Sequence, residues 1–155
     1  MQKIMLNSNI YGRPFDDLRD KVIFSQALAC YNIFALAHLE SLNIITSDVL
    51  FAEIELISDK SKRDAVHSLA KGTQTERVSL NDTIIDLADG VHTKISDYMD
   101  CLHIAFCAYS GSSHLITCDN ELINKARSIE KLLSMRGYIL RIIGPVQFLA
   151  EVSEI

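Results

Sequence analysis

Residues 3–17 read KIMLNSNIYGRPFDD, a stretch in which a short apolar segment gives way to polar residues. Lys3–Leu6 is typical of a buried strand, and this strand ends at Asn7. Asn7 and Asn9 flank a single serine at that end, where a metal-binding chain usually presents an aspartate first. Two interpretations of Asn7 are open. It is a turn residue, for which asparagine is common, or it occupies a carboxylate position that has lost its charge.

Outward from that stretch, strand-like and helix-like segments alternate along the chain. We expect strands at 3–6, 44–46, 76–80, 114–117 and 138–143. We expect helices at 17–42 (as one or two), 48–58, 60–70, 81–94, 97–110, 120–135 and 146–152. This alternation predicts an α/β fold, a three-layer α/β/α sandwich with a mostly parallel central sheet, formed by one domain over 1–155. In such sheets, sites lie beyond the carboxyl ends of the strands.

Composition narrows the function classes. The formal net charge of −5 excludes a broad nucleic-acid-binding surface, so any contact with nucleic acid has to be local. Apolar runs such as Ile33–Ala37 are too short to span a bilayer, and no secretory leader opens the chain. We therefore expect a cytoplasmic protein without a membrane segment. The cysteines show no zinc spacing and are expected to be reduced core thiols: Cys30, Cys101, Cys107 and Cys118.

Three carboxylates and one amide are candidate catalytic residues and metal ligands. Glu53 has apolar neighbours three and four residues away on its expected helix, and a carboxylate on an inward face is costly unless it is paired or bound to a cation. Asp100 falls in the first turn of an apolar helix, and Asp119 follows a strand and opens the next helix. Helix capping is the competing explanation for both aspartates. Asn7 is the fourth candidate, because strand ends and helix starts converge at one edge of a parallel sheet.

Convergent carboxylates repel one another, and a divalent cation relieves that repulsion. Oxygen ligands suit Mg²⁺ or Mn²⁺, and such an ion can polarise a phosphoryl oxygen and activate water against a phosphodiester. The ion also supplies the positive charge that an acidic chain lacks for binding a nucleic-acid backbone. Arg13 is a candidate substrate contact for a phosphate beside this site, with simple solvation as the alternative.

Five segments in order resemble PIN-domain proteins. LNSNIYGRPFDD (6–17), TSDVLFAEIE (46–55), DCLHIAFC (100–107) and LITCDNELINKA (115–126) are similar to the family's four signature regions, and LRIIGPVQFLAE (140–151) to its final strand and helix. The resemblance covers nearly the whole chain. It implies a Mg²⁺- or Mn²⁺-dependent ribonuclease acting on RNA, similar to VapC-type toxins, which pair with a small antitoxin protein and commonly form homodimers.

By this resemblance, Glu53, Asp100 and Asp119 take the second, third and fourth acidic positions of the family. Asn9 takes the place of the asparagine two residues after the first aspartate, and Thr117 takes the hydroxyl position before the last acid. Asn7 stands where the family most often has its first aspartate, by nature or by engineering. An amide oxygen can ligate a cation but adds no charge and accepts no proton, so we expect weak metal binding and a slow reaction or none.

Two function hypotheses remain open on the sequence, beside a third interpretation in which the chain is an α/β domain whose acidic residues are all helix caps. The first is a metal-dependent ribonuclease, in one version the toxin of a toxin–antitoxin pair, whose activity Asn7 weakens or abolishes. The second is an inactive PIN-like module that binds RNA or a protein partner. The apolar stretch 31–36 is either part of the core or an interface.

Overall fold

The computed structural model describes residues 2–153, and these residues build one sheet of five parallel strands. The strands are β1 (Gln2–Leu6), β2 (Leu42–Ser47), β3 (Gln74–Val78), β4 (His114–Ile116) and β5 (Arg141–Ile143). Their order across the sheet is β3-β2-β1-β4-β5, and every neighbouring pair is parallel. The predicted α/β class with a parallel central sheet is confirmed.

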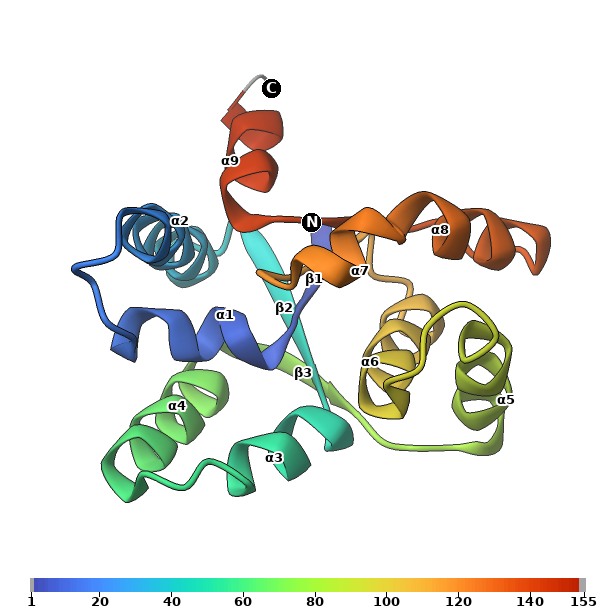
Figure 1. Ribbon diagram of the computed structural model, residues 1–155, viewed down its shortest axis with the longest axis horizontal. Coiled ribbons are helices and arrows are strands. Elements are labelled where there is room, and N and C mark those ends of the chain that lie inside the picture. Colours follow the sequence, from blue (N-terminus) through green and yellow to red (C-terminus); the bar gives the residue numbers. More distant parts are fainter. Residues whose placement is uncertain (1, 154–155) are drawn as a thin grey trace.

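Helices cover both faces of this sheet (Figure 1). They are α1 (Ser8–Gly12), the 3-10 helix η1 (Arg13–Phe15), α2 (Lys21–His38), α3 (Asp48–Glu55), α4 (Lys60–Thr73), α5 (Asp82–Val91), α6 (Tyr98–Tyr109), α7 (Asn120–Asn124), α8 (Ala126–Met135) and α9 (Pro145–Ser153). One face carries α1, α2, α4 and α9, and the other carries α5, α6 and α8. The arrangement is the expected three-layer sandwich.

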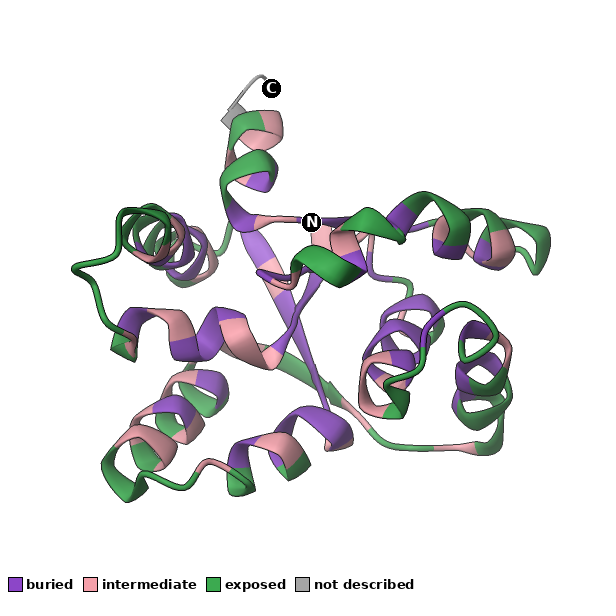
Figure 2. Ribbon diagram, in the orientation of Figure 1, coloured by how far each residue is buried: buried purple, intermediate pink, exposed green. Residues whose placement is uncertain are grey.

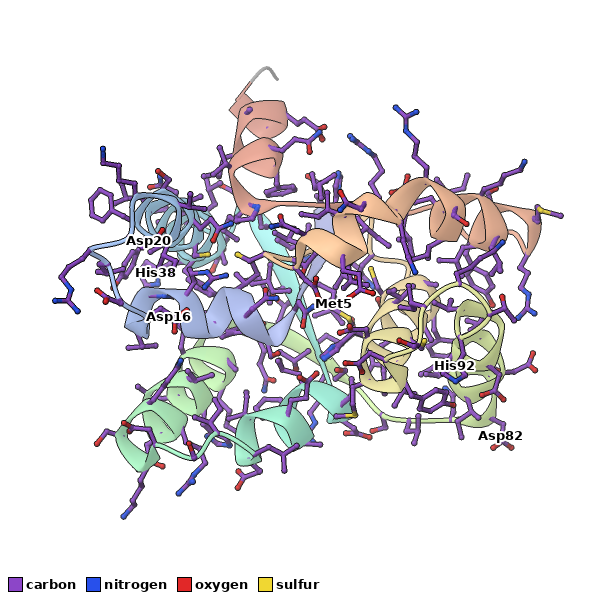
Figure 3. All side chains as sticks on the ribbon, viewed as in Figure 1. Met5, Asp16, Asp20, His38, Asp82 and His92 are labelled. Carbon is purple, nitrogen blue, oxygen red and sulfur yellow. The ribbon has the colours of Figure 1, made fainter. Side chains whose placement is uncertain are left out.

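The two core clusters follow from the alternation of side chains along buried strands. Ile4 and Ile44 pack with the α2 and α4 side of the molecule, whereas Met5 and Ile45 pack with the α5 and α6 side. Figure 2 shows buried residues along β1 and β2, and Met5 lies at the centre of the molecule in Figure 3. Strands buried on both faces explain the continuous apolar runs of the sequence.

The chain reverses its direction of travel across the sheet between β1 and β4. From β1 it moves outward to β2 and β3, then returns to place β4 and β5 on the other side of β1. The carboxyl ends of β1 and β4 are joined by a bond from Asn7 N to the Ile116 carbonyl oxygen, at 2.9 Å. Residues that follow these strands therefore meet at the switch point where ligands bind in open α/β sheets.

Several predicted boundaries are wrong at the helices. The expected helix over 17–42 is α2 alone, starting after the cap Asp20, while residues 8–15 form α1 and η1, which the sequence did not suggest. The expected helix over 120–135 is divided at Lys125, whose backbone (φ −98°, ψ 3°) leaves helical geometry. The helix expected at 60–70 continues to Thr73, because the Thr73 hydroxyl and Gln74 N–H bond to carbonyl groups of the preceding turn.

Strand lengths are set by pairing partners. The strand expected at 138–143 is confined to 141–143, because its only neighbour in the described sheet, β4, is three residues long. The strand expected at 76–80 lies at 74–78 in register with β2, and α3 ends at Glu55 rather than at 58. The predicted domain of 1–155 stays a prediction, since Met1, Glu154 and Ile155 lie outside the described residues.

No helix within residues 2–153 has both the length and the hydrophobicity needed to cross a bilayer. The cysteines are free and buried, in agreement with the expectation of core thiols: Cys30, Cys101, Cys107 and Cys118.

Candidate functional site

Asn7 begins the site at the carboxyl end of β1. Its side-chain Oδ1 accepts a hydrogen bond from Ser8 N at 2.7 Å, which makes Asn7 the cap of the short helix α1. Asn7 is 3% exposed. The turn interpretation is thus correct in part, since the side chain caps a helix, yet the residue is buried where a capping asparagine is ordinarily solvated.

Thr117 receives the bonds that hold this edge together. Its Oγ1 lies 3.1 Å from Asn7 Nδ2, 3.2 Å from Asn9 Nδ2 and 3.1 Å from Asp119 N. Both amide orientations are fixed by backbone N–H groups, because Ser8 N donates to Asn7 Oδ1 and Cys118 N donates to Asn9 Oδ1. The end of β1 and the segment after β4 are therefore fastened to one hydroxyl.

Glu53 reaches the same region from α3. Its Oε2 accepts from the Ser8 hydroxyl at 3.2 Å, and its Oε1 is in close contact with Nε2 of His103 on α6. Burial raises the pKa of Glu53, but the bond and charge of His103 and the Ser8 hydroxyl outweigh it and hold the pKa below its usual range. The pairing that an inward-facing glutamate requires is supplied by a histidine fifty residues away in the sequence.

Asp100 lies in the first turn of α6 without acting as its cap. Asp97 caps the helix, accepting from Met99 N at 3.0 Å and from Asp100 N at 3.4 Å. Burial raises the pKa of Asp100 to about 6, with further contributions from the negative charges of Asp97, Asp119 and Glu53. Helix capping therefore does not explain Asp100, whose carboxylate is half-buried among other carboxylates.

Asp119 caps α7, in agreement with the capping interpretation of the sequence. Its Oδ1 accepts from Glu121 N at 2.9 Å. Its charge also raises the pKa of Asp100, so the two aspartates lie within electrostatic reach. The capping hydrogen bond uses one lone pair of Oδ1, and the other lone pairs of this half-buried carboxylate stay available.

Arg13, the predicted phosphate contact, is engaged elsewhere. Its Nη1 donates to Asp16 Oδ2 at 2.9 Å, and its Nε is buried without a hydrogen-bond partner within residues 2–153. Asp16 also binds Lys62 Nζ at 2.8 Å. Lys62, together with Ser8, Asp16 and Glu53, lines a hollow of about 320 Å³, where Asp16 balances the charge of Lys62.

A divalent cation is the group that these oxygens imply. The oxygen ligands are of the right chemical kind for such an ion, but in the described part of the chain too few of them come together to hold it. Carboxylates of Asp100, Asp119 and Glu53 and the amide oxygen of Asn7 are ligands of the kind that Mg²⁺ and Mn²⁺ take. Within residues 2–153, however, no three His, Cys, Asp or Glu side chains form a group able to hold an ion. Glu53 gives its two oxygens to His103 and Ser8.

The sequence missed two residues that the structure brings to the site, Ser8 and Lys62, whereas His103, for which the sequence suggests a core or supporting role, contacts Glu53. Ser8 lies between the two asparagines, and that position at a strand end was the available signal. His103 follows Asp100 by one helical turn, a spacing that places both on one side of α6. Lys62 carries no local signal, because its contact with Asp16 depends on how α4 packs beside η1.

Replacing Asp100 by asparagine is expected to stabilise the metal-free protein at neutral pH. Folding raises the pKa of Asp100 from 3.8 to about 6, so its ionised form costs stability above that range. The cost disappears as the pH falls from about 6 to below about 4, where the carboxyl is protonated in both states. For a half-buried group we expect Asp100→Asn to raise the melting temperature by about 2–4 °C at pH 7.5.

The same measurement at pH 4 should show no gain, and Asp64→Asn on the exposed surface of α4 is the matched control. A melting temperature of Asp100→Asn equal to or below that of the unaltered protein at pH 7.5 would contradict the account of the site's charge.

Comparisons with known proteins agree with this geometry at the level of the family. The sequence model of the PIN domain matches residues 26–128, and no curated protein matches the chain. The matched range contains Glu53, Asp100, Thr117 and Asp119 but begins after β1 and so omits Asn7. PIN domains have a nuclease-type fold and generally use divalent metals. Because the match covers most of the chain, the protein belongs to the PIN domain family.

Proposed function

We propose that the protein is a metal-dependent ribonuclease of the PIN type that hydrolyses RNA phosphodiesters, with activity weakened by Asn7. The observation that supports the proposal most strongly is the raised pKa of Asp100 among other carboxylates. Its carboxyl has a pKa raised to about 6 by burial and by the charges of Asp97, Asp119 and Glu53. Structural carboxylates are usually paired with cations or caps, whereas mutually repelling carboxylates at a sheet edge are typical of a catalytic site.

In this proposal Asp100 and Asp119 hold the cation, Glu53 joins them once it leaves His103, and Asn7 contributes its amide oxygen. A Mg²⁺ or Mn²⁺ ion bound there would neutralise the carboxylates and supply positive charge to a phosphodiester. Before Glu53 joins the cation, His103 keeps it ionised, and Asn9 and Thr117 hold the ends of β1 and β4 in place. A phosphate-binding role for Arg13 or for Lys62 requires release from Asp16.

The hydrogen bonds around Thr117 suit an aspartate at position 7 better than the asparagine that is there. A hydroxyl has one proton and two acceptor lone pairs, yet three donors approach Thr117 Oγ1. An aspartate at position 7 would accept the Thr117 proton, and the hydroxyl would then accept only from Asn9 and from Asp119 N. The network therefore suits a carboxylate at this position better than the amide it has.

The second candidate is a catalytically inactive module that binds RNA or a protein. It is favoured by the engagement of the side chains: Asn7 bonds at both ends of its amide and Glu53 at both oxygens. A site whose groups are satisfied by one another has less need of a cation.

Restoring aspartate separates the two candidates. Asn7→Asp should raise Mn²⁺-dependent cleavage of a single-stranded RNA by at least about tenfold, because the new carboxylate adds a charged ligand and a proton acceptor. The rate is measured with a fluorescent RNA oligonucleotide at fixed protein concentration. Ser68→Asp on the exposed side of α4 adds the same charge elsewhere and should leave the rate unchanged.

Asp100→Ala in the Asn7→Asp background should remove the gain, which would assign the cleavage to this site rather than to a contaminating nuclease. Absence of cleavage by both the unaltered protein and Asn7→Asp, with both proteins folded, would exclude the ribonuclease and leave the binding module.

A toxin role in a toxin–antitoxin pair, in the cytoplasm, follows from the resemblance to VapC-type proteins and is part of the proposal. Beside α3 and α6 lies an apolar hollow of about 210 Å³, lined by residues that include Val49, Met99 and Phe106, which suits an apolar segment of a small antitoxin. A small reading frame immediately upstream in the genome supports this role, and its absence counts against it.

We propose a homodimer through the outer side of α2. Phe24, Leu28 and Tyr31 follow one another at spacings of four and three residues and are 46%, 50% and 54% exposed, whereas Ile33 and Phe34 belong to the core. Within the stretch 31–36, Tyr31 thus belongs to the proposed interface, whereas Ile33 and Phe34 belong to the core. Light scattering should give twice the 17.4 kDa chain mass, and Tyr31→Glu should return it to one chain mass; a monomer at all concentrations would exclude the dimer.

A further inference from the structure

Positive charge gathers on one surface of this acidic protein. Lys94, Lys125, Arg127, Lys131 and Arg136 are all exposed and make up five of the fifteen Lys and Arg residues of the chain. Among the ion pairs of residues 2–153, none includes any of the five. Most other cations are neutralised by a carboxylate, as in the Arg77–Asp48 and Arg141–Glu151 pairs. This surface therefore keeps its full charge.

Four of these cations line a hollow of about 740 Å³, which we call the basic hollow, and the fifth, Lys125, bonds to the backbone of Lys94. Its walls are Lys94, Arg127, Ser128, Lys131, Leu132, Met135 and Arg136. It is larger than the hollow of about 320 Å³ beside Glu53. Side chains tipped with nitrogen extend outward from α8 in Figure 3, and the outer side of that helix is exposed in Figure 2.

The sequence of α8 builds the basic hollow by helical spacing. Arg127 and Lys131 are four residues apart and share one face, while Ile129 and Leu133 are buried on the opposite side. Glu130, the only carboxylate of α8, turns away from the cations, and its Oε2 accepts a hydrogen bond from Ile142 N at 3.0 Å. The helix thus removes its own negative charge from the surface.

Contacts with α5 and the following loop hold the remaining cations in place. Lys125 Nζ donates to the Lys94 carbonyl oxygen at 3.3 Å, and Arg136 Nη1 donates to the Asp86 carbonyl oxygen at 3.5 Å. Arg136 lies across Gly90, where a Cβ atom would come within 2.8 Å of its Nη2. The guanidinium occupies space that only a glycine leaves open.

Two short chain segments connect Lys94 and Lys125 at the basic hollow to the candidate catalytic residues. Lys94 lies in the loop that leads into α6, six residues before Asp100. Lys125 lies at the far end of α7, whose cap is Asp119, and a five-residue helix is only about 7.5 Å long. A polymer bound between Asp100 and Asp119 therefore needs little extra length to reach these cations.

We propose that the basic hollow binds backbone phosphates of single-stranded RNA and serves as a second RNA-binding surface next to the catalytic cleft. RNA as the ligand rests on the proposed function, and the continuity of the cations with Asp100 and Asp119 favours it over an acidic protein segment. Single-stranded RNA also combines charge with exposed bases, and Leu132 and Met135 provide apolar surface between the cations. An acidic chain thereby binds RNA locally, through a cluster without carboxylate partners.

The test is RNA affinity in the absence of metal. A labelled single-stranded RNA is titrated with protein in EDTA and read by fluorescence anisotropy, so that binding is measured without cleavage. Arg127→Ala/Lys131→Ala should raise Kd about five- to tenfold at 0.1 M salt. It should also reduce the slope of log K against log salt by about 1.4, since each lost phosphate contact removes about 0.7 on single strands.

Lys21→Ala/Lys71→Ala is the matched control, because both lysines are exposed, lie on α2 and α4, and have no ion pair within residues 2–153. It should change Kd less than twofold and leave the salt slope unaltered. Lys94→Ala should lower the slope by about 0.7. Because Lys94 lies in a loop outside α8, this variant shows that the loss of affinity does not come from a local disturbance of α8.

Equal RNA affinities for the unaltered protein and Arg127→Ala/Lys131→Ala would overturn the proposal. So would tighter binding of polyglutamate than of RNA to the unaltered protein, lost in that variant, because the surface would then serve an acidic protein. Failure of Asn7→Asp to cleave RNA, with the binding result as expected, overturns the ribonuclease and leaves the basic hollow standing.

Discussion

The hydroxyl of Thr117 is the group on which the candidate site depends. Asn7 and Asn9 reach it from the end of β1, and the backbone of Asp119 reaches it from the segment after β4. These are the two strands between which the chain reverses its course across the sheet. The hydroxyl thus fixes the position of Asp119 relative to Asn7 at the edge where parallel sheets bind their ligands.

Charge is balanced unevenly around that hydroxyl. Glu53 is stabilised by His103 and Ser8, so its ionised form is favoured, whereas the pKa of Asp100 is raised by burial and by its acidic neighbours. A cation would relieve Asp100 and Asp119, and a fourth carboxylate at position 7 would strengthen its attraction. With Asn7 in place, the electrostatic repulsion is smaller and the driving force for binding a cation is smaller too. If the proposed function holds, asparagine at position 7 favours folding of the metal-free protein and weakens the site.

Much of this arrangement could be predicted from the sequence because it depends on local pattern. Strands that end in polar residues, such as Lys3–Leu6 before Asn7, identify the carboxyl edge, and parallel crossovers bring these ends together. The short helix α1 escaped prediction because five residues show no helical periodicity, and the break at Lys125 has no glycine or proline to mark it. The Glu53–His103 pair could not be predicted, because it joins residues fifty positions apart through the packing of α3 against α6. Four of the five cations at the basic hollow lie together within residues 125–136, and the fold brings Lys94 from the loop before α6 to them.

The central claim is that Asp100 belongs to a cation site formed with Asp119 and Glu53. Isothermal titration of Mn²⁺ into the unaltered protein and into Asp100→Ala measures it most directly. The account predicts a saturable heat for the unaltered protein that is lost in Asp100→Ala. Identical heats for the two proteins would mean that no specific cation site includes Asp100.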